Sequence, residues 1–198
     1  MDAFVPQIQH FRFYEDDGTE ATASAIAGGE DPINLDRDNN ADSQLHLRYS
    51  VEETGAGSVG GGGGDTWQLQ FRPNGAGGWV NVTAASSRVQ SDVASQLTDD
   101  GATTNRAVDG LTDPGSGSFE AGVQEEGDGV LTHQLGADNF TEHVYALDLI
   151  AADNAAAEFI EFRISYNGGA PGVTNNVTPK ITITKPAAPG GRRIFVVS

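Results

Sequence analysis

The stretch that decides the fold is QIQHFRFYEDDGTEATASAIA, residues 7–27. In its first half one set of side chains, Ile8, His10, Arg12 and Tyr14, alternates with another, Gln9, Phe11 and Phe13. Alternation with a period of two predicts a β-strand with one set on each face. Asp17-Gly18 then predicts a hairpin turn, because glycine tolerates the positive φ that tight turns need. The small, polar residues 19–27 predict a returning strand near a sheet edge.

Two further strands follow with the same period. In residues 44–52 the set Leu45, Leu47, Tyr49 and Val51 alternates with His46, Arg48, Ser50 and Glu52, which predicts a half-buried strand with one wet face. Residues 66–72 turn Trp67, Leu69 and Phe71 inward. Asn74-Gly75 then predicts a turn into a strand at 78–83. We expect both Trp67 and Trp79 to anchor the core, since large aromatic side chains bury the most area.

Regular alternation resumes late in the chain, over residues 141–151, 158–166 and 177–185. The total is seven or eight strands separated by turn residues, with no long helical pattern. This predicts an all-β fold, an antiparallel β-sandwich of immunoglobulin-like or jelly-roll-like type. We expect one domain over residues 1–185, followed by a linker and arm over 186–198.

Residues 84–140 differ from the rest of the chain. They contain three Asp-Gly pairs, many Ser and Thr residues and few strand patterns. Val89, Val93 and Leu97 have the spacing of a short helix within 87–97. Long segments of weak pattern inside a compact domain are often functional. We therefore interpret 84–140 as an elaborated loop region that projects from one end and contacts partners.

Composition excludes several kinds of chemistry. The chain has 198 residues and no cysteine, so disulfides, thiolate metal sites and cysteine nucleophiles are excluded. Its net charge of −17 argues against binding nucleic acid or an anionic membrane. The first ten residues lack the pattern of a secretory signal, and no segment reaches transmembrane length. We expect synthesis in a cytoplasm, without export or membrane insertion.

Charge is distributed unevenly along the chain. The first 161 residues hold all 28 acidic side chains and 6 basic ones, whereas residues 162–198 hold 5 basic ones. The chain ends in an arm of two cations and four apolar residues: Arg192, Arg193, Ile194, Phe195, Val196 and Val197. An apolar strand tends to pair. Pairing with a neighbouring copy's sheet edge and folding back onto its own domain are both open.

One stretch has the spacing of a calcium loop. Asp36, Asp38, Asn40 and Asp42 occupy positions 1, 3, 5 and 7 of that pattern. Position 6 is Ala41 instead of glycine and position 12 is Leu47 instead of glutamate, which excludes an EF-hand. A looser structural Ca²⁺ site and an ordinary solvated acidic loop both stay open, the second being the more frequent outcome.

No catalytic motif is present. Residues 55–60 match G-x-G-x-x-G, but more glycines follow where a helix must begin, so the match is accidental. His46 and His143 lie on predicted strands, where lone histidines are usually surface residues, and we assign them no role. We expect neither enzymatic activity nor a cofactor beyond the calcium alternative.

A resemblance to a known group of proteins bears on function. HFRFYEDDGTEATA, residues 10–23, together with DSQLHLRYSVEE, DTWQLQFRPNGAGGWVNVT and EFIEFRISYNG, resembles a β-sandwich module of tailed-bacteriophage structural and surface proteins. The resemblance implies a virion protein, such as a capsid decoration, head-fibre or tail-associated subunit. Its partners would be further copies and other virion proteins. A carbohydrate- or receptor-binding adhesin module, with a host-surface receptor or glycan as partner, is the alternative.

Overall fold

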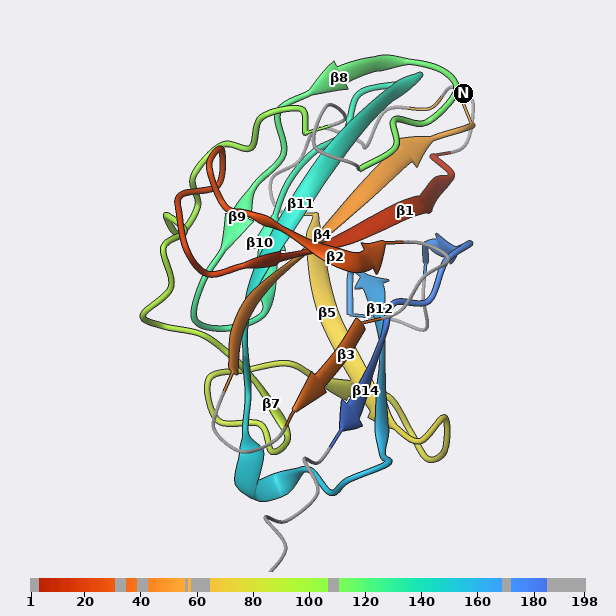
Figure 1. Cartoon of the computed structure of the whole chain (residues 1–198). Helices are drawn as coiled ribbons and strands as arrows, with labels where there is room; N and C mark the ends of the chain where they lie inside the picture. Colours follow the sequence, from red (N-terminus) through yellow and green to blue (C-terminus); the bar gives the residue numbers. More distant parts are fainter. Residues whose placement is uncertain are drawn as a thin grey trace, which may run out of the picture.

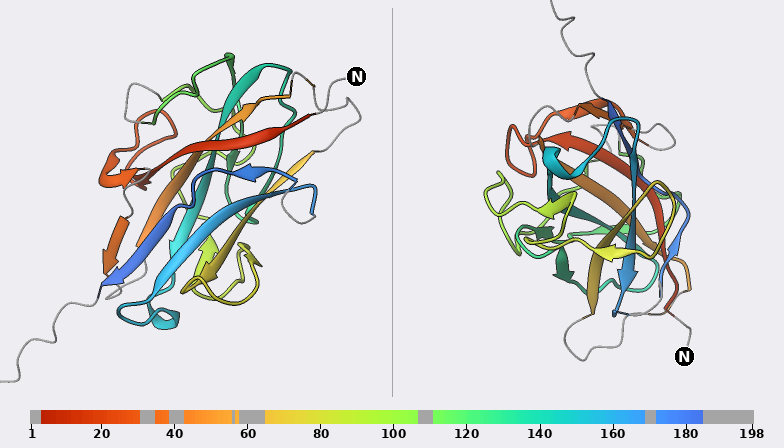
Figure 2. Two further views of the ribbon diagram at one scale, coloured as in Figure 1. Left: turned by 90° about the vertical axis from the view of Figure 1, so that its right-hand side faces the viewer. Right: turned by 90° about the horizontal axis from the view of Figure 1, so that it is seen from below.

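The computed structural model describes residues 4–30, 35–38, 43–55, 57, 65–106, 111–168 and 172–184. These residues form an all-β fold of two mixed sheets packed face to face, which confirms the predicted β-sandwich (Figure 1, Figure 2). A single turn of 3-10 helix, Ala151–Asp153, is the helical element of the described ranges. None of their helices is long and apolar enough to span a membrane.

The larger sheet has the order β13-β1-β4-β11-β7, with β2 paired to β1 and with β8 and β9 paired to β11. Its strands are β1 (Pro6–Glu15), β2 (Ala25–Glu30), β4 (Ser43–Glu53), β7 (Val89–Ser91), β8 (Ser118–Glu120), β9 (Gln124–Glu125), β11 (Asn139–Leu149) and β13 (Thr174–Asn175). The long pairings, β1 with β4 and β4 with β11, are antiparallel. Short parallel pairings join β13 to β1, and β8 and β9 to β11.

The smaller sheet has the order β10-β5-β12-β14-β3, with β6 paired to β5. Its strands are β3 (Leu35–Asp38), β5 (Thr66–Pro73), β6 (Val80–Asn81), β10 (Val130–Thr132), β12 (Phe159–Tyr166) and β14 (Lys180–Thr184). Here β3 runs parallel to β14, while the other pairs are antiparallel.

The core lies between the two sheets and is rich in aromatic side chains. Trp67 on β5 is fully buried, as predicted, and its indole Nε1 donates to the carbonyl of His133. Tyr49 and Tyr145 meet edge to face, and Phe13 crosses the interface to contact Phe162. Contacts of this geometry add to the burial of apolar area that holds the sheets together.

The opening hairpin differs from its prediction in two ways. A register shift between Ile8 and His10 inserts one extra residue in β1, so Ile8 joins Phe11 and Phe13 on the core face. The sequence pattern had placed Ile8 with His10, and a bulge of this kind reverses the faces along a strand. The returning strand begins at Ala25 instead of residue 19, because residues 16–24 form the turn.

The predicted wet face of β4 is wrong. Every residue from Leu45 to Glu53 is buried, and β11 is buried almost throughout. The reason is the segment 84–140, which we name the covering segment. Its described residues contribute β7, β8 and β9 along the open edge of β11 and cover the outer face of the sheet. It therefore packs on the sheet instead of projecting from one end, and the predicted helix at 87–97 is instead the short strand β7 with turns.

Candidate functional site

The outer face of the larger sheet carries a layer of buried polar side chains. On β4 these are His46, Arg48, Ser50 and Glu52, and on β11 Glu142 is fully buried. They alternate with the core residues of the same strands, so the pattern that predicted a wet face located them correctly. Their environment is dry because the segment 84–140 and the β1–β2 turn lie over them.

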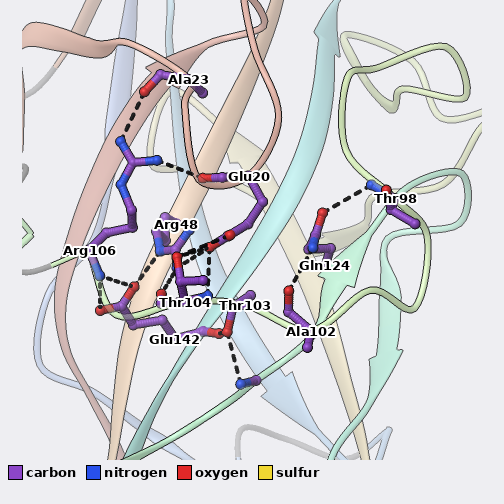
Figure 3. A network of polar contacts seen from close by, with 11 residues as sticks. Glu20, Ala23, Arg48, Thr98, Ala102, Thr103, Thr104, Arg106, Gln124 and Glu142 are labelled. Carbon is purple, nitrogen blue, oxygen red and sulfur yellow. Dashed lines mark hydrogen bonds and ion pairs between the residues drawn. The ribbon is translucent and has the colours of Figure 1, made fainter.

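Four charged residues at the centre of this layer form what we name the charge network: Glu20, Arg48, Arg106 and Glu142 (Figure 3). Arg48 donates through Nε to Glu142, and its Nη2 lies 2.6 Å from a carboxylate oxygen of Glu20. Arg106 donates from its backbone nitrogen to both carboxylate oxygens of Glu142. Each of the four side chains is at most 7% exposed, so these contacts are shielded from water.

The charge network joins three separate parts of the chain. Arg48 and Glu142 belong to the sheet, Glu20 to the β1–β2 turn and Arg106 to the covering segment. Arg106 also donates to the carbonyls of Glu20 and Ala23, at 2.6 and 3.0 Å, and its guanidinium lies 4.9 Å from the centre of the Tyr14 ring. The turn and the covering segment are thus both fastened to one sheet.

Hydrogen bonds between uncharged groups attach further parts of the covering segment to β11 and to one another. Thr103 donates to the carbonyl of Glu142 and accepts from the backbone of Gly122, at 2.7 and 2.8 Å. The side chain of Gln124 bonds the carbonyl of Ala102 and the amide of Thr98 (Figure 3). Buried groups with these partnerships hold a loop in a single conformation, because breaking any of them leaves an unsatisfied polar atom.

Burial and charge pairing act in opposite directions on the pKa of Glu142. Desolvation raises the pKa of Glu142, and the guanidinium of Arg48 opposes that rise. Two arginines and two glutamates balance in charge, so the charge network is locally neutral within an acidic protein. The guanidinium of Arg48 pairs with both carboxylates, whereas that of Arg106 donates to two backbone carbonyls, so the two arginines tie the turn and the covering segment to the sheet.

His46 and His143 are buried, in contrast to their prediction as surface residues. His46 lies with its Nε2 2.8 Å from a carboxylate oxygen of Asp16. His143 is fully buried beside Trp67, and its Nε2 lies 3.2 Å from Nδ1 of His133. Desolvation lowers the pKa of His143 well below its usual range and also lowers the pKa values of His46 and His133.

Glu125 on β9 is another buried acid, outside the charge network. Its carboxylate accepts from the hydroxyl of Ser91 and from the amides of Asp128 and Gly129. Desolvation outweighs these hydrogen bonds and raises the pKa of Glu125 to about 7. The residue therefore titrates near neutral pH inside the covering segment.

A different polar surface lies on the outer face of the smaller sheet, and we name it the arginine–tryptophan face: Gln70, Arg72, Trp79, Asn81, Glu161 and Arg163. Trp79 is partly exposed instead of lying in the core as predicted. The guanidinium carbons of Arg72 and Arg163 each lie 4.5 Å from the centre of its ring. Arg72 bonds Glu161 and Arg163 bonds Gln70, at 2.7 and 2.8 Å.

The calcium-loop alternative stays a prediction, because the structure describes two of its four residues. Asp36 is exposed on the edge strand β3, and Asp38 ends that strand, while Asn40 and Asp42 lie outside the described residues. Within the described ranges no three His, Asp or Glu side chains cluster in a way that would hold a metal ion. The arm residues 192–197 also lie outside the described part of the chain.

Sequence reasoning did not find the partners in either polar surface. Glu20 and Arg106 lie in segments with no periodic pattern, 28 residues before Arg48 and 36 residues before Glu142 in the chain. The one available signal was the run of polar residues on β4, opposite a strongly apolar set. Trp79 directly follows Gly77-Gly78. Because it lies so close to a turn, alternation could not predict which face of the sheet its side chain lies on.

Comparison with known proteins identifies no relative. No protein-family model, no curated protein and no solved structure matches this chain. The resemblance to phage structural proteins therefore stays an expectation drawn from the sequence. The features of the molecule that bear on function are the charge network, the arginine–tryptophan face and the two sheets on which they lie.

Proposed function

We propose that this protein is a structural subunit of a tailed-bacteriophage particle, working by binding to neighbouring subunits and without catalytic turnover. The sequence resemblance and the β-sandwich fold support this role, together with the contrast between an acidic body and a basic C-terminal stretch. The proposed partners are copies of the same chain and other particle proteins, joined through surface loops and the arm at 192–197.

The observation that carries the proposal is the use of buried charge to fix surface segments. The charge network is anchored by Arg48 on β4 and Glu142 on β11, and it holds both the β1–β2 turn and the covering segment against these strands. A subunit that must present the same surface to many neighbours gains from such a preformed shape, because less conformational entropy is lost on binding.

Light scattering after size exclusion tests this proposal. The full chain should form oligomers, whereas a version ending at Lys185 should be monomeric with an unchanged circular dichroism spectrum. Phe195→Asp in the full chain provides a milder variant, since a charge at that position opposes strand pairing. Monomers in all three samples would contradict assembly through the arm.

A second candidate is a glycan- or receptor-binding module. The predicted location for sugar contacts, the segment 84–140, offers Phe119 and Phe140 as its aromatic residues, and these rings pack on one another with their centres 5.7 Å apart. The arginine–tryptophan face is the observation that favours this candidate, since it combines a partly exposed indole with amides and guanidinium groups.

A further inference from the structure

The arginine–tryptophan face has unused hydrogen-bonding capacity. Arg72 and Arg163 both donate through Nε along the sheet, to Glu161 and Gln70. Their terminal guanidinium nitrogens have no partner within the part of the chain that the structure describes. Two planar forks with open ends suit a carboxylate, which accepts two parallel N–H bonds from an arginine.

The local charge of this face is opposite to that of the whole molecule. Arg72, Arg163 and, on the neighbouring strand, Lys180 surround one carboxylate, that of Glu161. Arg163 bonds an amide oxygen and the Trp79 ring, and no carboxylate among the described residues forms an ion pair with it. Burial and the nearby Arg72 lower the pKa of Arg163, which is the direction expected for cations held close together.

The neutral groups of the face have the chemistry of a sugar site. The side chain of Gln70 accepts from Arg163 and donates to Asn81 at 2.8 Å, so both amides are oriented before any ligand arrives. An indole ring beside such amides can contact the C–H groups of a pyranose while the amides reach its hydroxyls. Guanidinium, amide and indole groups occur together on adjacent strands β5, β6 and β12.

We propose that the arginine–tryptophan face binds a carboxylate-bearing saccharide, a uronic-acid unit of a polysaccharide. The carboxylate accepts from the open guanidinium ends of Arg72 and Arg163, and the sugar ring lies against Trp79. Oriented amides of Gln70 and Asn81 reach its hydroxyl groups. This inference is independent of assembly through the arm, because none of the residues that carry it belongs to the arm.

Tryptophan fluorescence gives a direct readout. The chain has two tryptophans, of which Trp67 is fully buried and Trp79 is partly exposed. The full chain is titrated with trigalacturonic acid, with its methyl ester and with inorganic phosphate. The acid should change the emission in a saturable way and protect it from iodide quenching, whereas the ester and phosphate should do neither in the same concentration range.

Matched arginine variants identify the site. Arg72→Gln and Arg163→Gln should each weaken binding about tenfold or more, the size expected for loss of a charge-assisted hydrogen bond. Arg88→Gln is the control, since the Arg88–Glu158 pair is exposed to the same degree as Arg72–Glu161. Unchanged affinity in both face variants, or equal binding of the ester, would overturn the proposal.

Two other outcomes would also overturn it. Competition by phosphate as strong as binding of the acid would make the face a general anion site. Self-association that Arg163→Gln abolishes while the full chain ignores the saccharide would make a second copy the occupant. Melting temperatures of all variants are measured in parallel, and partly exposed arginines of this kind should change them little.

Discussion

At the scale of single residues, Arg48 bonds three acceptors at once: the buried carboxylates of Glu20 and Glu142 and the carbonyl of Thr104. Arg48→Met keeps much of the side-chain length but leaves two buried carboxylates without their shared partner. We expect a loss of about 3–5 kcal/mol in the free energy of unfolding, as for other broken buried ion pairs. Urea denaturation followed by circular dichroism measures it.

Arg72→Met is the matched control for this prediction. Arg72 and its partner Glu161 are 30% and 19% exposed, so water screens the pair. Its loss should cost less than about 1 kcal/mol. If the two substitutions lowered the free energy of unfolding equally, burial would not explain the contribution of Arg48 to stability.

The His133–His143 pair predicts a pH dependence. Desolvation lowers both pKa values in the folded state from 6.5, so the unfolded chain takes up these protons first as the pH falls. The contribution of the pair to stability is complete above pH 6.5 and is lost progressively below it. His143→Gln should therefore cost more stability at neutral than at acidic pH, measured by urea unfolding over that range.

The variant has to be compared with the original chain at each pH, because Glu125 changes stability with pH in the direction opposite to the histidines. Its pKa is raised to about 7, so the folded state holds a proton that the unfolded state releases, and stability falls as the pH rises from about 4.5 through 7. A cost of His143→Gln that stays constant with pH would contradict a neutral His143 buried beside the partly buried His133.

At the residue scale the sequence allowed part of the two polar surfaces to be predicted. The polar set of β4 could be read from alternation, since a period of two separates faces whatever covers them. Whether that face is wet depends on distant segments, and Glu20 and Arg106 have no local pattern linking them to Arg48. Trp79 was expected in the core on size alone, which says nothing about the neighbouring arginines.

At the scale of elements, the covering segment depends on close backbone approach at Gly122. A side-chain carbon at this position would collide with the carbonyl oxygen of Glu142 and the hydroxyl of Thr141. Gly122→Ala should therefore lower the free energy of unfolding by about 1–3 kcal/mol, the cost typical of overpacking. Thermal and urea unfolding both measure it.

Gly115 provides the comparison within the same segment. It is exposed, and a side-chain carbon there would meet nothing within 4 Å. Gly115→Ala should leave stability nearly unchanged. A similar loss in both variants would show that the segment is sensitive to glycine replacement in general, and not to contact with β11.

The elements themselves were predictable where alternation ran for several residues. The long strands β1, β4, β5, β11 and β12 match their predicted ranges closely, whereas β14 begins at Lys180, three residues later than predicted. The prediction missed short strands such as β3, β8, β9 and β13. Two to four residues cannot display a period, and such strands form because a neighbouring strand pairs with them. The bulge in β1 reversed the facing of Ile8, a change that alternation cannot signal.

At the scale of the whole molecule, burial of the larger sheet on both faces makes the body thicker than a two-sheet sandwich with one wet face. Segments from residues 16–24, 92–106 and 111–125 form part of this body through the charge network and its neighbouring hydrogen bonds. The all-β class followed from the sequence. The layer over the sheet did not, since it is built from irregular backbone.

Hydrogen–deuterium exchange of the full chain, followed by mass spectrometry, tests the central claim that this layer is a fixed part of the fold. The amides of Thr103, Gly122 and Gln124 all donate within the layer. They should exchange as slowly as those of β4 and β11, and Arg48→Met should accelerate them first. Exchange within seconds in the original chain, as in a free loop, would contradict the account.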